Sequence, residues 1–346
     1  MFKYLKDIAQ ITMGQSPKSS CYNSNHNGLP FLQGRTTFGR IFPWYDTWSS
    51  EWNKEALPND ILFTVRAPVG DVNICQTKTA IGRGLASIRA INCNAKYLFY
   101  LLQANNTLFS SNSTGTIFES INKDSLENTQ LFIHSNEEQV LIVNTIGSVD
   151  DLIENLNKIK DKLHKFVSIR LKNEPSLIKP LGDYINIYDN IRKPLSSMER
   201  TGEKIYPYYG ATGVLDYVNN YIFNDEYVLL AEDGSVMNNE EKPIIQYISG
   251  KSWVGNHAHV LKATNGLTLY SLYFILKDTN VKNAVTGAVQ MKINQSNLKK
   301  INIKLPIEIE KINKFTESVM NEIIIINNKL INLNILKQQY LKKFFG

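Results

Sequence analysis

Two stretches of the chain carry a stripe of apolar residues at alternating steps of three and four. This spacing is typical of a helix that packs lengthwise against another helix. In the first stretch, residues 135–173, Ser135 and Glu138 have the spacing of a capping box at a helix start. The second stretch covers residues 306–346. The predicted contact residues are Val149, Leu152, Leu156, Ile159, Leu163 and Phe166 in the first stretch and Phe315, Val319, Ile326, Leu330 and Leu333 in the second.

Each predicted helix needs a partner, because a stripe this apolar is unfavourable in water. The simplest arrangement packs the two helices against each other. About 35 residues at ~1.5 Å per residue would then form a rod of roughly 50 Å. The alternative is that both are ordinary core helices.

The regions between these helices repeat each other in sequence order. Residues 30–34 (PFLQG) are matched by residues 207–210 (PYYG). The strongest match pairs residues 114–117 (TGTI) with residues 286–289 (TGAV), at an offset of 172 positions. Several weak matches in one order predict a duplicated module in which each copy is followed by a long helix.

Each module alternates short strand-like runs with turn residues. Residues 61–65 (ILFTV), 227–231 (YVLLA) and 244–248 (IIQYI) are rich in the side chains that strands favour. Residues 97–102 (YLFYLL) and 270–276 (YSLYFIL) predict short buried helices. We therefore predict an α+β fold in four parts. The parts are a first domain at 1–134, a central helix at 135–173, a second domain at 174–305 and a C-terminal helix at 306–346.

The composition is that of an ordinary globular protein, with 43% hydrophobic and 20% charged residues in a chain of 346. No apolar run approaches the ~20 residues that a membrane-spanning helix needs. The net charge of +6 is spread thinly, so any nucleic-acid surface has to be a local patch formed by folding. Cys21, Cys75 and Cys93 lack metal-ligand spacing and fit free thiols in a reducing cytoplasm.

The motifs of several enzyme classes are absent from the sequence. The chain has neither the Pro-Pro loop of an amino-methyltransferase nor a GxxxxGK[ST] nucleotide-binding loop. Asp233, Glu240 and Lys242 have the types of residue found in a metal-dependent nuclease, but they lie in a polar run typical of an exposed loop. His257 and His259 could bind a metal from one face of a strand, but no third ligand is evident nearby. We therefore predict a chain without catalytic residues, metal or cofactor of its own.

Polar residues suited to DNA recur beside turn glycines in both modules. Arg and Lys bind phosphates or guanine edges, and Gln and Asn pair with adenine, while glycine lets a backbone approach a ligand closely. Each residue alone is more simply a solvated loop residue, but their recurrence at matching places favours DNA contact. The candidates are Gln15, Lys18, Ser19, Gln33, Arg35, Thr36, Arg66 and Arg83 in the first module and Arg192, Lys193, Tyr208, Tyr209, Thr212, Lys251, Asn256 and His257 in the second.

Several runs of residues together resemble the specificity subunit of type I restriction–modification systems. The resemblance covers essentially the whole chain, and the combination of runs is more specific than any one of them. The runs are MGQSPKSS at 13–20, LPFLQGRTTFG at 29–39, VRAPVGDVNI at 65–74, IGRGLA at 81–86, NEEQ at 136–139, YPYYGATG at 206–213, LLAEDGS at 229–235 and WVGNHAHVL at 253–261.

This resemblance implies two target-recognition domains that alternate with two long helices paired antiparallel as a coiled-coil rod. Each domain would read one half of a two-part, gapped DNA sequence, and the rod would set the gap. The subunit would be non-catalytic and would bind two methyltransferase subunits, which carry S-adenosylmethionine and methylate adenine. A restriction subunit would use ATP and Mg²⁺ to cut unmodified DNA.

Two other functions stay open on the residues alone. A self-contained DNA nuclease or methyltransferase would act as the purified chain, given a metal ion or S-adenosylmethionine. A coiled-coil adaptor that binds only proteins would show background DNA binding even at low salt, where electrostatic binding to DNA is strongest.

Overall fold

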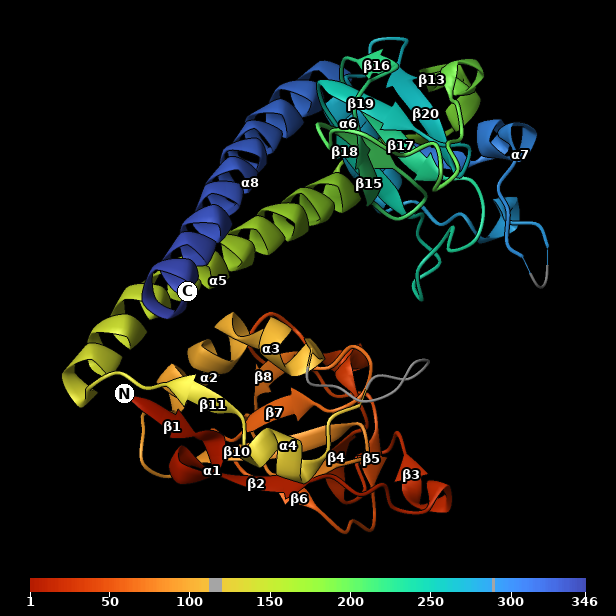
Figure 1. Ribbon diagram of the computed structural model, residues 1–346. Coiled ribbons are helices and arrows are strands. Elements are labelled where there is room, and N and C mark those ends of the chain that lie inside the picture. The colour runs from red at the N-terminus through yellow and green to blue at the C-terminus, as the bar shows by residue number, and fades with distance from the viewer. Residues whose placement is uncertain (112–119, 288–289) are drawn as a thin grey trace. The chain divides into compact units, whose positions relative to one another are not determined.

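The computed structural model describes residues 1–111, 120–287 and 290–346 and divides the chain into two units (Figure 1). Unit 1 comprises Met1–Asn155 and Leu330–Gly346, and unit 2 comprises Leu156–Lys329. Each unit contains antiparallel sheets, short helices and a part of each of two long helices, α5 (Asn136–Asn173) and α8 (Ile309–Phe345). The prediction of two α+β domains is confirmed. Among the described residues, no helix is both long and apolar enough to cross a membrane.

Unit 1 is built on a four-stranded antiparallel sheet with a second, five-stranded sheet beside it in sequence and space. The first sheet has the order β2 (Ala9–Met13), β10 (Leu85–Ala90), β7 (Ile61–Thr64), β8 (Val72–Ile74). The second has the order β3 (Tyr22–Asn23), β5 (Trp48–Ser49), β4 (Leu29–Leu32), β9 (Thr79–Ile81), β6 (Glu55–Ala56). The remaining elements are a two-stranded ribbon of β1 (Phe2–Tyr4) and β11 (Gln130–Phe132) and the helices α1 (Leu5–Ile8), α2 (Ala95–Ala104), α3 (Asn106–Ser111) and α4 (Lys123–Glu127).

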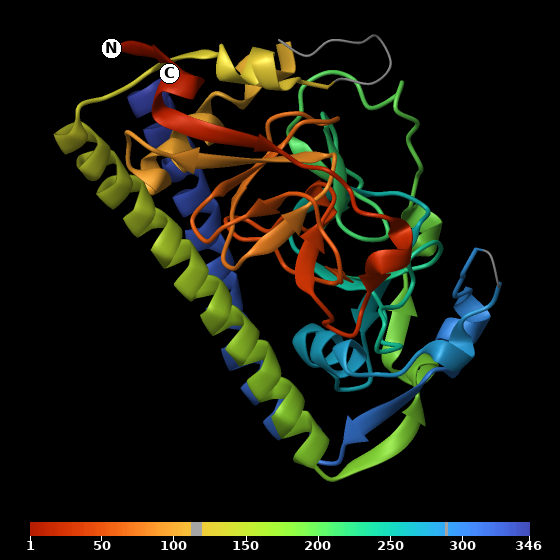
Figure 2. The same ribbon diagram turned by 90° about the horizontal axis from the view of Figure 1, so that it is seen from below.

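Unit 2 has the same plan. Its main sheet has the order β13 (Ile185–Ile187), β20 (Ala258–Ala263), β17 (Tyr227–Ala231), β18 (Ile245–Ile248). Its second sheet has the order β15 (Val214–Val218), β14 (Tyr206–Tyr209), β19 (Lys251–Val254), β16 (Phe223–Asn224). Figure 2 shows the two-stranded ribbon of β12 (Ser176–Pro180) and β21 (Asn302–Pro306), which joins α5 and α8 to this unit. Its short helices are α6 (Leu269–Lys277) and α7 (Gln295–Lys300).

The sequence repeat is also a structural repeat. In each unit a parallel strand pair is enclosed by antiparallel ones, and Leu32 opposite Ile81 corresponds to Tyr209 opposite Val254. The TGTI run at residues 114–117 and residues 288–289 of its counterpart lie outside the described residues.

The apolar runs form the cores of the two units. Residues 97–102 lie in α2 and are all buried, and residues 270–276 fall in α6, as the sequence predicts. Helix α2 begins where the Asn94 side chain accepts a hydrogen bond from the Tyr97 amide, and Thr268 caps α6 in the same way. The predicted strands at 61–65, 227–231 and 244–248 form most of β7, β17 and β18.

The predicted contact residues on α5 differ in burial. Val149 is buried and Leu156 and Leu163 are half-buried, whereas Leu152, Ile159 and Phe166 are 52%, 47% and 55% exposed. Other buried apolar positions of α5 are Ile142, Ile146, Ile153, Val167 and Leu171. Apolar residues occupy adjacent positions at 152–153 and 166–167, and the helix buries the second of each pair. On α8, Val319, Ile326 and Leu330 are buried, while Phe315 and Leu333 are half-buried.

The long helices contact each other inside each unit. In unit 2, the Phe166 and Phe315 rings meet edge to face with centroids 5.5 Å apart, and Lys160 Nζ donates to Asn327 Oδ1 at 3.4 Å. The residue numbers rise along α5 as they fall along α8, so these segments run antiparallel. In unit 1, Lys337 Nζ of α8 lies 3.0 Å from Asp150 Oδ1 of α5.

The Asp150 carboxylate is fully buried and joins four parts of unit 1. Besides Lys337, it binds the Arg40 guanidinium and accepts a hydrogen bond from the Tyr100 hydroxyl at 2.8 Å. Arg40 comes from the loop after β4, and Tyr100 comes from α2. Burial raises the pKa of Tyr100 and lowers the pKa of Lys337, which is 4% exposed. The carboxylate therefore offsets a buried ammonium group that would otherwise be costly.

We predict that Asp150→Ala destabilises unit 1 by about 3 to 5 kcal/mol, because it leaves the buried Lys337 without a counter-charge. Urea unfolding followed by circular dichroism measures this change. The double variant Asp150→Leu/Lys337→Met is the matched control, because it removes both charges and should recover most of the loss. Equal destabilisation in both variants would contradict this role of the ion pair.

A half-buried imidazole lies on the α5 segment of unit 2. His164 lies beside the Tyr273 and Phe274 rings of α6, and Lys277 Nζ is 3.3 Å from its Nδ1. Burial lowers the pKa of His164 to about 4, and the nearby Lys277 and Lys160 ammonium groups act in the same direction. The folded state therefore keeps this ring neutral at pH values where an unfolded chain protonates it.

We predict that this histidine makes unit 2 less stable as the pH falls from about 6.5 to about 4, because only the unfolded state binds the extra proton in this range. His164→Gln, which does not titrate, should give a shallower loss of stability over the same range. Urea unfolding at several pH values tests this, with His26→Gln at an exposed position as the control. Identical pH profiles for His164→Gln and the unsubstituted chain would rule out the effect.

Candidate nucleic-acid interface

Four candidate residues of unit 1 follow the ends of neighbouring strands. Gln15 follows β2, Gln33 follows β4, Arg66 follows β7 and Arg83 follows β9, and all four are exposed. The backbone N–H of Gln15 donates to the backbone carbonyl of Ile81 at 3.0 Å. These connections place the polar side chains at one edge of the unit's sheets.

Glycines let three of these loops lie against one another. A side chain at Gly82 would come within 2.9 Å of Ser16 Oγ and 3.2 Å of Gln33 Cα. A side chain at Gly84 would come within 2.3 Å of the Gln33 carbonyl oxygen. The Ser16 hydroxyl accepts a hydrogen bond from the Arg83 amide at 3.1 Å. The loops bearing Gln15, Gln33 and Arg83 therefore form one exposed patch, which we call patch 1.

The other unit 1 candidates are exposed as well. Arg35 and Thr36 lie in a short 3-10 helix, and Arg35 pairs with Asp71 at 2.7 Å. Lys18 and Ser19 lie at the start of another 3-10 helix, Ser19–Cys21.

Five of the eight unit 2 candidates are exposed. They are Lys193, Thr212, Lys251, Asn256 and His257. His257 Nδ1 lies 2.6 Å from Asp233 Oδ1, and the Lys251 ammonium lies over the Tyr221 ring at 4.8 Å. Asn256 and His257 precede β20, at the position that Arg83 and Gly84 occupy before β10.

The other three unit 2 candidates are less exposed. Arg192 is mostly buried, because its guanidinium pairs with Glu232 at 2.7 Å and with Asp189 at 3.3 Å. Tyr208 is 4% exposed, and its hydroxyl accepts a hydrogen bond from the Leu195 amide. Both side chains are therefore engaged inside the unit. Tyr209 is half-buried against the apolar cluster around β17 and β20, and burial raises its pKa.

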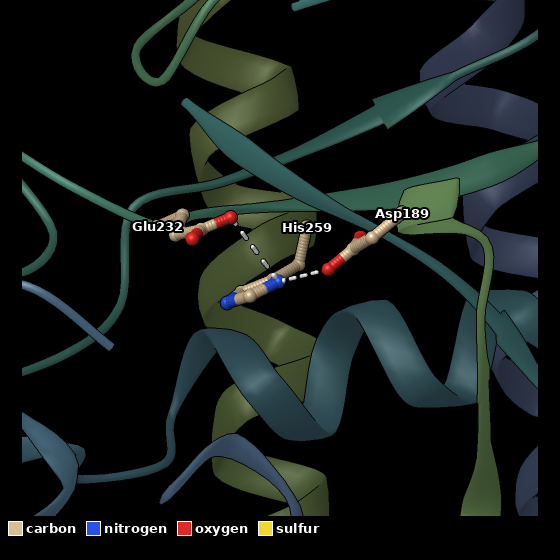
Figure 3. A group of neighbouring side chains, drawn as sticks. All are labelled: Asp189, Glu232 and His259. Atoms are coloured by element: carbon tan, nitrogen blue, oxygen red, sulfur yellow. Dashed lines mark hydrogen bonds and ion pairs between the residues drawn. The ribbon is translucent and has the colours of Figure 1, made fainter. Parts of the chain in front are cut away.

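Asp189, Glu232 and His259 of unit 2 form a cluster in which both carboxylates face the imidazole ring (Figure 3). His259 Nδ1 is 2.6 Å from Asp189 Oδ2 and 3.7 Å from Glu232 Oε2, and its Nε2 is 2.7 Å from the Ile293 carbonyl oxygen. Both ring nitrogens of His259 therefore lie within hydrogen-bonding distance of oxygen acceptors. Burial alone would raise the pKa of Asp189 and of Glu232, but hydrogen bonds from His259 and Arg192 respectively hold each below its usual value.

The cluster has the residue types of a metal site but not its chemistry. A metal ion needs an imidazole lone pair, and both nitrogens of His259 are already engaged by oxygen acceptors. The carboxylates are balanced by Arg192 and by Lys292, which lies 3.1 Å from Glu232. The cluster is therefore a buried ion-pair network. His257, the other half of the possible histidine pair, binds Asp233 instead.

The nuclease-like triplet does not come together. Asp233 pairs with His257, whereas Lys242 pairs with Glu240 at 2.9 Å and with Asp278 at 3.0 Å. The ion pairs of Lys242 are therefore with Glu240 and Asp278, and that of Asp233 is with His257.

Residues 1–165 and 173–334 match the family model described as "Type I restriction modification DNA specificity domain". The chain belongs to this family. The resemblance inferred from the residues is confirmed. One of the two matched segments falls mainly in each unit.

Individual relatives extend this result. The chain is 40% identical over 165 residues to a putative type I restriction enzyme MjaX specificity subunit of Methanocaldococcus jannaschii, covering 47% of this chain and 38% of that protein. It is 39% identical over 128 residues to a putative type I restriction enzyme specificity subunit, S.HindORF215P, of Haemophilus influenzae, covering 37% of this chain and 32% of that protein. The aligned parts thus span well under half of either relative.

A solved structure shares the fold over the full length. The crystal structure of a type I restriction–modification S subunit from M. genitalium aligns with a TM-score of 0.58 and covers 100% of this chain and 96% of that one. The sequence identity is 17%, so this likeness establishes the architecture of the specificity family alone.

The ion-pair network of this specificity-family chain is not evident from single residues. Glu232 directly follows β17 and Asp189 lies two residues after β13, positions that are usually exposed at a turn. The available signal is the internal repeat, because the matching positions of unit 1 are apolar.

Proposed function

We propose that this chain is the DNA-recognition subunit of a type I restriction–modification enzyme and reads a two-part, gapped sequence. The observation that carries the proposal is the duplicated unit of a DNA specificity family, with exposed Gln, Asn, Arg, Lys and His side chains after equivalent strands in both copies. Amide and guanidinium groups at strand ends match the hydrogen-bonding pattern of base edges. One unit would read each half-site.

The long helices would set the gap between the half-sites. The antiparallel contacts of α5 and α8 within each unit support a coiled-coil rod that continues from one specificity domain to the other. Leu152 and Ile159 lie seven residues apart along α5 and stay exposed. Exposed apolar residues at heptad spacing fit a helix supplied by another protein.

The partners would be two methyltransferase subunits, joined by restriction subunits in a cutting complex. Each unit exposes apolar residues on its two-stranded ribbon, Phe2 and Phe132 in unit 1 and Leu177 and Ile178 in unit 2. A surface repeated in both units suits a partner that binds twice. S-adenosylmethionine, ATP and Mg²⁺ would reside on the partner subunits, and this chain would supply no catalytic residue.

We predict that Gln33→Ala/Arg83→Ala relaxes recognition of one half-site, because direct base contacts contribute about 1 to 3 kcal/mol each. The other half-site should be unchanged, since unit 2 is intact. Methylation of a randomised DNA library by the complex with the methyltransferase subunit measures both halves together.

Lys123→Ala on α4 serves as the control, because it also removes one positive charge from exposed surface of unit 1. It should leave both half-sites unchanged. Unaltered recognition by a folded Gln33→Ala/Arg83→Ala variant, or equal loss at both half-sites, would count against one unit reading each half.

A further inference from the structure

The ion-pair network of unit 2 occupies a place that unit 1 fills with apolar side chains. Met13 lies opposite Ala86 in the pairing of β2 with β10. The same register in unit 2, with Ile187 opposite Leu261, brings Asp189 to His259. Met13 is half-buried against the core and Ala86 is completely buried.

Glu232 has its own apolar counterpart. The Ile121 amide donates to the Val65 carbonyl at 3.0 Å, and the Ile293 amide donates to the Glu232 carbonyl at 2.8 Å. Val65 and Glu232 also make equivalent hydrogen bonds to the loop before β10 or β20. The Val65 amide donates to the Gly84 carbonyl, and the Glu232 amide donates to the His257 carbonyl. The triad Met13, Val65 and Ala86 therefore corresponds to Asp189, Glu232 and His259. An apolar version of this site folds in the same chain, so charge is not needed to form the sheet.

Arg192 extends the network to the exposed loop. Its guanidinium donates to the Ala258 carbonyl at 2.7 Å and to the Asn256 carbonyl at 3.3 Å, while also binding Glu232. The corresponding residue in unit 1 is Ser16, which holds the backbone of Arg83 by a single hydrogen bond. In both units, the side chain at this position hydrogen-bonds the backbone of the residue two positions before β10 or β20.

Lys193, Asn256 and His257 each adjoin a member of the network. Lys193 follows Arg192, and Asn256 is bound through its carbonyl oxygen. His257 lies between that carbonyl and the Ala258 carbonyl, and its ring binds Asp233, the residue after Glu232. Charge-assisted hydrogen bonds are short and directional, so they fix loop positions more narrowly than apolar contacts do.

We propose that Arg192, Asp189, Glu232 and His259 are positioning residues that set the specificity of the half-site read by unit 2, by fixing Lys193, Asn256 and His257. This proposal rests on the proposed function. The four residues touch no base themselves and act through the loop that they hold. The half-site read by unit 1 does not depend on such a network.

The test replaces the network with the residues of unit 1. The fourfold variant Asp189→Met/Arg192→Ser/Glu232→Val/His259→Ala removes all of its buried charges together, a change that proteins often tolerate without loss of stability. Arg192→Lys is the second variant, because an ammonium group keeps the charge but cannot bind Glu232 and two carbonyl groups in the same fork. Lys292→Met is the matched control, since it removes a partner of Glu232 at the rim and leaves the loop bound.

The readout is the methylated sequence selected from a randomised library by each chain in complex with the methyltransferase subunit, alongside thermal unfolding. We expect the fourfold variant and Arg192→Lys to prefer the correct bases of one half-site about tenfold less, the scale of one displaced base contact. The other half-site and the Lys292→Met complex should match the unsubstituted protein.

Unchanged selectivity at both half-sites in the folded fourfold variant and in Arg192→Lys would overturn the proposal and leave the network a purely structural one. If the fourfold variant does not fold, Arg192→Lys decides by the same criterion. Failure of the proposed function is a separate result, in which the unsubstituted complex selects no two-part sequence.

Discussion

The buried carboxylate of Asp150 is the constraint on which unit 1 depends. A charge without solvent must be matched by fixed partners, and here those partners come from three directions: Arg40 from the loop after β4, Tyr100 from α2 and Lys337 from α8. Sliding or rotating either long helix would separate these groups. A polar contact within an apolar helix seam selects one register, so this carboxylate ties the helices to the domain that carries patch 1.

The two units share a backbone plan but place their buried charges differently. In unit 1, Asp150 is buried where the long helices meet the domain and Asp60 is buried with Arg89 on the main sheet, whereas in unit 2 the network adjoins the exposed loop before β20. The register of the strand pairs is the same in both, which shows that hydrophobic patterning and strand pairing define the fold. The buried polar groups are additions to that fold, and they lie next to the surfaces that differ between the copies.

Much of the architecture could be predicted from periodicity. The long helices, the core strand at 61–65 and the duplicated order of elements follow from runs of apolar residues. The spacing predicts Leu152 as a contact residue of α5, whereas the helix buries Ile153. Both residues are apolar, so spacing alone cannot choose between these neighbours. The sequence predicts Arg192 as a DNA contact because its partner Glu232 is distant along the chain. Only the fold brings the guanidinium and this carboxylate together.

The central claim is that one chain reads two half-sites at a separation fixed by its helices. The most direct measurement inserts seven residues into α5 between positions 156 and 160 and seven into α8 between positions 327 and 330, and then maps methylated DNA with the gene intact, altered or deleted. Seven residues add about 10 Å, so the gap should lengthen by about three base pairs with both half-sites unchanged. An active variant with the original gap, or methylation that persists after deletion, would contradict the account.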